Sequence, residues 1–112
     1  MNEKIAVPVA QGQFAMHFGH CEKFIIFEVE NKKVKNTTAI IPPPHAPGVL
    51  PKFLGEQGVN CIIAGGMGMR AQELFAENGV KVIVGAIGTE PNKLVEEYLS
   101  DSLQKGNNIC DH

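Results

Sequence analysis

The segment from Cys61 to Arg70 constrains the fold most, because it joins an apolar run to a helical pattern through Gly65, Gly66 and Gly68. The apolar run is typical of a buried strand, and residues 70–77 predict the helix that follows. Because glycine has no Cβ, we expect the turn to adopt positive φ and to let a ligand approach its backbone closely. The first N–H groups of a helix have no acceptor within it, so this turn is suited to negative charge.

Arg70 is the only arginine of the chain, and it falls in the first turn of this helix. A cation near a helix N-terminus is unfavourable with respect to the helix dipole, so its position indicates a bound anion. The predicted anion-holding set is Gly65, Gly66, Met67, Gly68 and Arg70. The alternative is a tight strand–helix connection in which Arg70 is simply solvated.

The chain reads as strand, strand, strand, helix, strand, helix, strand, helix, which predicts an α/β fold. The predicted strands are residues 4–9, 23–30, 34–41, 60–64 and 80–84. The predicted helices are residues 49–57, 70–77 and 90–99, the last with Thr89 as N-cap and Pro91 in its first turn. We expect one domain over residues 1–105, with residues 106–112 as a polar tail. The alternation of strand and helix after residue 60 implies parallel pairing with right-handed crossovers.

Four predicted loops should then meet at one edge of the sheet, namely residues 10–22, 42–48, 65–69 and 85–88. In open α/β sheets, ligands bind outside the carboxyl ends of the strands. All four histidines of the chain lie in these loops or in the tail. We therefore expect the functional site at this edge.

The loops carry a set of borderline and soft metal ligands, to which Cys110 and His112 of the tail could be added. Imidazole, thiolate and thioether groups favour iron, copper, zinc or a metal–sulfur cluster over magnesium or calcium. The chain has no C-x₂-C pair and only three cysteines, so a closed zinc site or a four-cysteine cluster is not predicted. We predict an open or transient metal site with the ligands His17, His20, Cys21 and His45. Taken singly, each of these residues is more often solvated, and Met67 and Met69 are equally compatible with packing.

Composition excludes several classes of function. A net charge of −2 with 20% charged residues argues against a nucleic-acid or membrane-surface binder, since both need a basic face. The N-terminus lacks the features of a signal peptide, so a cytoplasmic location is expected. Hydrolysis assisted by a divalent metal needs paired carboxylates, yet Asp101 and Asp111 are the only aspartates.

A dinucleotide site is a weaker alternative for the glycine turn. Residues 66–71 fit the pattern G-x-G-x-x-A between a strand and a helix. The acidic residue expected at the end of the next strand is absent, because Val84 and Gly85 stand there.

The motifs together resemble the dinitrogenase iron–molybdenum cofactor biosynthesis family, of the NifX/NafY type. The resemblance rests on the His17-Phe18-Gly19-His20-Cys21 loop, the segment from His45 to Pro51, the Gly65-Gly66-Met67-Gly68 turn and the closing Cys110-Asp111-His112. It implies a three-layer α/β/α ribonuclease H-like fold with a five-stranded mixed sheet. It also implies binding of the iron–molybdenum cofactor or an iron–sulfur precursor during transfer between proteins, with His17 as the foremost ligand.

The sequence therefore predicts a cytoplasmic, non-catalytic carrier of a metallocluster, with cluster-assembly proteins as possible partners and no nucleic acid or membrane. Two alternatives remain open at this point. One is a nucleotide- or phosphate-binding regulatory domain that uses the same glycine turn. The other is a partner-binding module without a ligand.

Overall fold

The computed structural model describes residues 2–15, 22–41, 49–86 and 90–100. Its strands are β1 (Asn2–Ala10), β2 (Gln13–Phe14), β3 (Lys23–Glu30), β4 (Lys33–Ile40), β5 (Cys61–Ile63) and β6 (Lys81–Ile83). Its helices are α1 (Val49–Glu56), α2 (Met69–Glu77) and α3 (Pro91–Leu99). The predicted helices and the longer strands are thus present, each within a few residues of its expected bounds.

The strands form one mixed sheet in the order β4-β3-β1-β5-β6, with β2 added to β1. β1 runs antiparallel to β3 and parallel to β5, and β5 runs parallel to β6. Parallel pairing of the last strands, expected from the alternation of strand and helix, is confirmed. The prediction of five strands is wrong, because β2 makes the described sheet six-stranded. β2 arises where Gln11 and Gly12, both at positive φ, turn the chain back onto the end of β1.

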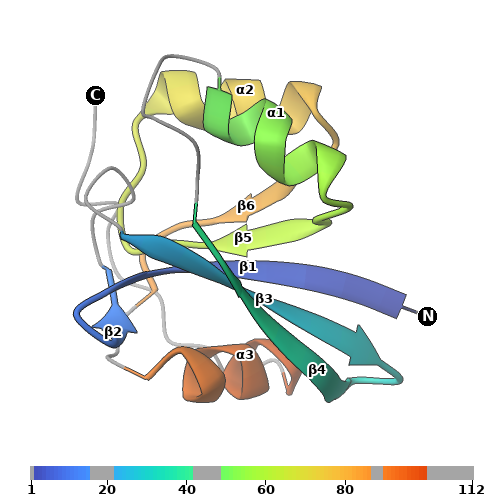
Figure 1. Ribbon diagram of the computed structural model, residues 1–112. Coiled ribbons are helices and arrows are strands. Elements are labelled where there is room, and N and C mark those ends of the chain that lie inside the picture. Colours follow the sequence, from blue (N-terminus) through green and yellow to red (C-terminus); the bar gives the residue numbers. More distant parts are fainter. Residues whose placement is uncertain (1, 16–21, 42–48, 87–89, 101–112) are drawn as a thin grey trace.

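Helices cover both faces of the sheet, with α1 and α2 on one side and α3 on the other (Figure 1). Leu54 of α1 and Phe75 of α2 are fully buried in a cluster with Phe24 of the sheet. Leu94 and Val95 of α3 are buried in a second cluster on the opposite face. The apolar residues of β1 and β5 alternate between these clusters because successive strand side chains point to opposite faces. The three-layer arrangement is therefore fixed by two separate cores.

Turn chemistry sets the ends of the elements. Gly58 and Gly79 follow α1 and α2 with φ of +82° and +76°, a conformation that glycine adopts without strain. Pro8 pairs with Phe24 of β3, whereas the β1–β5 pairing reaches only Ala6. Because proline has no backbone N–H to donate to a ladder, Pro8 is compatible with this early end of pairing on the β5 side.

The start of α3 differs from the prediction of Thr89 as N-cap. The N-cap is Glu90, with φ −99° and ψ 115°, and no side chain caps it. Pro91 then occupies the first helical turn as expected, where its missing N–H has no cost. Among the described helices, none has the length and apolar character needed to cross a membrane.

Candidate functional site

The carboxyl ends of β1, β4, β5 and β6 lie at one edge of the sheet. This follows from the pairing, because β5 and β6 run parallel to β1, and β4 is antiparallel to β3, which is itself antiparallel to β1. These ends gather on the left of Figure 1, away from the N-terminus. We call this edge the carboxyl edge; α2 begins there, directly after the glycine turn formed by residues 65–68.

Backbone hydrogen bonds hold the glycine turn against the chain that leaves β6. Ala64 N donates to the Ile83 carbonyl at 2.8 Å, and Gly85 N donates to the Gly65 carbonyl at 2.9 Å. A third bond of 3.2 Å runs from Ala86 N to the Ala64 carbonyl. The two connections therefore form one rigid unit, in which Gly65, Gly66 and Met67 are buried.

The positive φ expected in the glycine turn does not occur at Gly65, Gly66 or Gly68, the last of which is the N-cap of α2. Gly68 has φ −66° and ψ 157°, which is extended backbone open to any residue. Positive φ falls instead on Gly85 in the neighbouring connection, at +80°. At this edge, the backbone conformation that favours glycine therefore occurs at Gly85, in the connection that follows β6, and not in the glycine turn.

The backbone donors at the N-terminus of α2 have no acceptor among the residues that the structure describes. Gly68 offers no side-chain cap, and the first turn of the helix holds no acidic residue. The first helical bond runs from Gln72 N to the Gly68 carbonyl at 3.1 Å, so the N–H groups ahead of Gln72 have no helical acceptor. Such a terminus attracts an anion through its N–H groups and its dipole together.

Gln72 is a positioning residue that the sequence reasoning missed. Its Nε2 donates to the Met67 carbonyl at 2.9 Å, which ties the second turn of α2 back to the glycine turn. A glutamine four residues after a glycine N-cap is a signal that could have been read from the sequence, since it lies where it can reach back over the turn.

Arg70 is exposed at the carboxyl edge. Its Nη1 lies 3.9 Å from Glu73 Oε2, and the side chains of the two residues are 80% and 58% exposed. A pair this long and this solvated contributes little, so the guanidinium can turn toward an incoming anion at small cost. The predicted role of Arg70 in anion binding stays a prediction.

The two methionines of the turn have different environments. Met67 is 1% exposed and belongs to the core cluster beneath α1 and α2. Met69, at the first position of α2, is 57% exposed. The Met67 side chain is therefore a packing residue, as the alternative interpretation predicted. The Met69 thioether, by contrast, is open to solvent.

The predicted metal ligands lie outside the described residues; they are His17, His20, Cys21 and His45, together with Cys110 and His112 of the tail. Within the described ranges, no group of three or more His, Cys, Asp and Glu side chains is arranged to hold a metal ion. Cys61 is the described free cysteine, buried at the other end of β5 as a core residue. The metal site thus stays a prediction.

The opposite end of the sheet carries a polar cluster that the sequence did not indicate. The Tyr98 hydroxyl donates to Glu3 Oε1 at 3.2 Å, and Lys81 Nζ lies 5.8 Å from the centre of the Tyr98 ring. The Cys61 side chain neighbours Tyr98. Burial, above all, raises the pKa of Cys61 to about 11 and also raises the pKa of Tyr98. Cys61 and Tyr98 are both uncharged near pH 7, and the Tyr98–Glu3 hydrogen bond joins α3 to β1.

Comparison with known proteins identifies relatives over nearly the whole chain. The family model described as dinitrogenase iron-molybdenum cofactor matches residues 1–101. The uncharacterized protein MJ0580 of Methanocaldococcus jannaschii is 33% identical over 107 residues, which cover 91% of this chain and 90% of that protein.

Solved structures agree with the fold. The crystal structure of PH0822 superposes with a TM-score of 0.84 at 26% identity, covering 91% of this chain and 93% of the other. The apo form of the orange protein from Desulfovibrio gigas superposes with a TM-score of 0.73 at 19% identity, covering 95% and 94%. The second likeness concerns the fold alone.

Proposed function

The chain belongs to the dinitrogenase iron-molybdenum cofactor family, and on that premise we propose that it carries a metallocluster and catalyses no reaction of its own. The cargo is the iron–molybdenum cofactor or an iron–sulfur precursor. The observation that carries the proposal is the uncapped N-terminus of α2 at the carboxyl edge. Such clusters carry negative charge. Among the described residues, the N–H groups of this terminus have no acceptor, and the first turn of α2 holds no carboxylate.

The proposed ligands belong to segments of the chain that join strands at the same edge. His17, His20 and Cys21 fall between β2 and β3, and His45 falls between β4 and α1. Imidazole and thiolate are the donors that iron in a metal–sulfur cluster accepts. In the proposal these side chains bind the metal, while the glycine turn and Arg70 contact the anionic sulfide surface.

A non-catalytic role agrees with a site in which side chains bind the metal and the glycine turn contacts the anionic surface. A carrier must release its cargo, so a few side-chain ligands combined with backbone contacts suit it better than a closed cage. We include in the proposal a cytoplasmic location, cluster-assembly proteins as donors and acceptors, and the ribonuclease H-like label. The central strand path β4-β3-β1-β5-β6 with helices on both faces supports that label.

The direct test is metal analysis with an absorption spectrum on protein purified without oxygen. The protein is measured before and after incubation with iron–molybdenum cofactor or with an iron–sulfur source. We expect bound iron, which is lost in the His17→Ala, Cys21→Ala double variant. The matched control is Cys61→Ala, which removes a cysteine from the other end of β5 and should retain the iron. Equal iron in the double variant and the parent protein would contradict the proposed ligands.

The nucleotide alternative is separated by a thermal-shift panel. A nucleotide that binds the folded state at a hundred times its Kd stabilises it by about 2.7 kcal/mol and raises Tm. A metal-free protein whose Tm rises with one nucleotide class would replace the carrier proposal. A protein that responds to neither metallocluster nor nucleotide would leave the partner-binding alternative.

A further inference from the structure

The strand path β4-β3-β1-β5-β6 ends in two edge strands, β4 and β6, which differ in how well they are protected from pairing. β6 has three residues, and short edge strands resist the addition of another strand. β4 has eight residues, and within the described part of the chain it pairs with β3 alone. Residues 33–39 are exposed and Ile40 is half-buried, so no described helix covers either face of most of β4. The long accessible edge of the sheet is therefore β4.

Among the described residues, those that protect the edge of β4 lie in its first half. Lys33 and Lys35 lie there, and the register with β3 shifts between Glu28 and Val29, opposite Lys35. Lysines and bulges on an edge discourage pairing. From Asn36 to Ile40 the register is regular and no side chain is charged. This second half runs toward the carboxyl edge and is ready to accept a strand.

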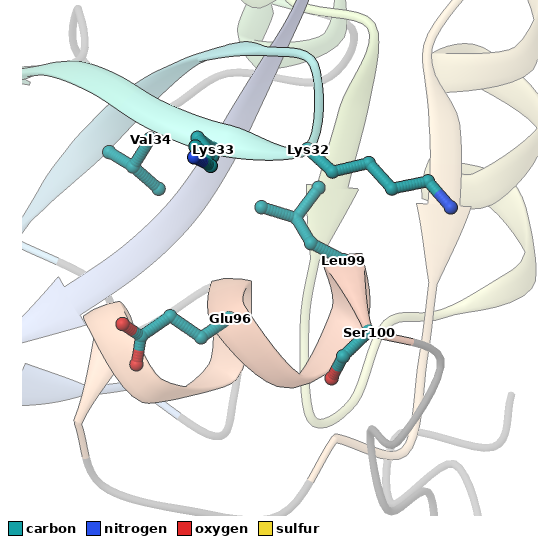
Figure 2. A pocket seen from close by; sticks show the side chains of 6 residues that line it. All are labelled: Lys32, Lys33, Val34, Glu96, Leu99 and Ser100. Carbon is teal, nitrogen blue, oxygen red and sulfur yellow. The ribbon is translucent and has the colours of Figure 1, made fainter.

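A groove lies beside the protected half, between the β3–β4 turn and the end of α3. Its volume is about 780 Å³, within the range of ligand pockets. Figure 2 shows the side chain of Leu99 rising from α3 toward the hairpin, with Val34 farther along the strand beyond Lys33. Val34 is 39% exposed, and Leu99 is half-buried against the second core cluster, so the two residues offer a partly exposed apolar floor.

Charge around the groove favours a carboxylate. Lys35 is paired with Glu30 at 3.1 Å, whereas Lys32 and Lys33 form no ion pair with any residue that the structure describes. Glu96 on the α3 side is a single negative charge against these two lysines. An acidic side chain entering at the hairpin end would therefore be attracted rather than repelled.

We propose that an extended acidic segment of a partner protein adds to β4 as the next strand of the sheet. Backbone hydrogen bonds form along residues 36–40, an apolar side chain rests on Val34 and Leu99, and acidic side chains lie beside Lys32 and Lys33. Because β4 ends at the carboxyl edge, this partner lies along the path to the cargo. Only the identification of the partner as a cluster donor or acceptor rests on the proposed function, since the binding itself needs no cargo.

The test uses the full chain and a fluorescein-labelled peptide about as long as β4, with alternating threonine and valine and two glutamates at one end. Its matched control ends in two lysines instead. Fluorescence anisotropy measures affinity, and amide hydrogen exchange measures protection in β4. We expect the acidic peptide to bind more tightly and to slow exchange in residues 36–40. The Lys32→Glu, Lys33→Glu variant should bind the acidic peptide about tenfold more weakly, because attraction of the peptide's glutamates becomes repulsion.

A charge-matched control is the Lys52→Glu, Lys93→Glu variant, which changes two exposed lysines away from the groove. Equal weakening in both variants, equal binding of both peptides, or unchanged exchange in β4 would overturn the proposal. A free protein that sediments as a dimer with β4 already protected would assign the edge to a second copy and overturn it too. Metallocluster loading measured on the Lys32→Glu, Lys33→Glu variant should be unchanged, so failure of peptide binding is distinguishable from failure of cargo binding.

Discussion

The two ends of the parallel strands handle their polar groups in opposite ways. At the carboxyl edge, the N-terminus of α2 has no side-chain cap, and Arg70 is nearly free in solvent. At the other end, Tyr98 bonds to Glu3, and the Asn60 side chain accepts a 2.8 Å bond from the backbone N–H of Lys4. No described buried side-chain nitrogen or oxygen lacks a partner. The satisfied polar groups at the Tyr98 end stabilise the fold, whereas the uncapped donors at the carboxyl edge are available to bind a ligand.

The end that carries Tyr98 and Glu3, which we call the closed end, has Cys61 buried at its centre. Cys61 is 1% exposed there, and burial keeps its thiol protonated well beyond the ordinary range. A charged or reactive group would be costly at this position, whereas unpaired donors at the carboxyl edge are solvated and inexpensive until an anion arrives. If this contrast is correct, Cys61 at the closed end should be inaccessible and the N-terminus of α2 should be available to a ligand.

The largest expected effect is on thiol reactivity. In a Cys21→Ser, Cys110→Ser variant, only Cys61 remains. With a pKa of about 11 it holds little thiolate at pH 8, so its reaction with a disulfide reagent should be about a hundredfold slower than in the urea-unfolded chain. The measurement is release of the chromophore over time in each state. Equal rates would mean that this end opens readily and that the contrast between the ends is wrong.

The next effect is a loss of stability at alkaline pH. The pKa values of Cys61 and Tyr98 are raised in the folded state, so the unfolded chain releases protons first as pH rises. The contribution of Cys61 is complete below about pH 9 and is lost as pH approaches about 11. Its size is at most about 3 kcal/mol. Urea unfolding across this range measures the slope, which should be smaller in Cys61→Ala and in Tyr98→Phe than in the parent protein.

The smallest effect sharpens the description of the carboxyl edge. Gly68 has extended φ and ψ, so Gly68→Asp supplies a capping side chain without backbone strain. It should stabilise the protein by a few tenths of a kcal/mol, because aspartate caps only slightly better than glycine. The same carboxylate should weaken metallocluster binding, since it occupies the donors and repels the anionic cargo. The Gly68→Ala variant separates the two effects, because it adds a Cβ without adding charge. Cargo affinity that is unchanged in Gly68→Asp would remove the terminus of α2 from the site.

Local sequence was sufficient where one residue type dictates one conformation. The run from Lys23 to Glu30 predicts a strand with its observed bounds, because its aromatic and β-branched residues favour extended backbone. The end of α2 was readable from Asn78 and Gly79. By contrast, β2 has two residues and no periodicity, so only its pairing with β1 defines it. The N-cap of α3 is Glu90, one residue after the predicted Thr89. No side-chain hydrogen bond caps the helix there, so a search for a capping residue type does not find it.

The sequence by itself determined that strand, glycine turn and helix follow one another, and that the strand directions bring four connections to one edge. Hydrophobic periodicity and glycine chemistry act over a few residues and can be read without coordinates. Only the tertiary structure decided that Met67 faces the core while Met69 faces solvent. It also placed Cys61 beside Tyr98, and Leu99 beside the β3–β4 hairpin. These pairs are distant in the chain, and they meet because α3 must bury its apolar face against the sheet, an outcome set by packing rather than by any local pattern.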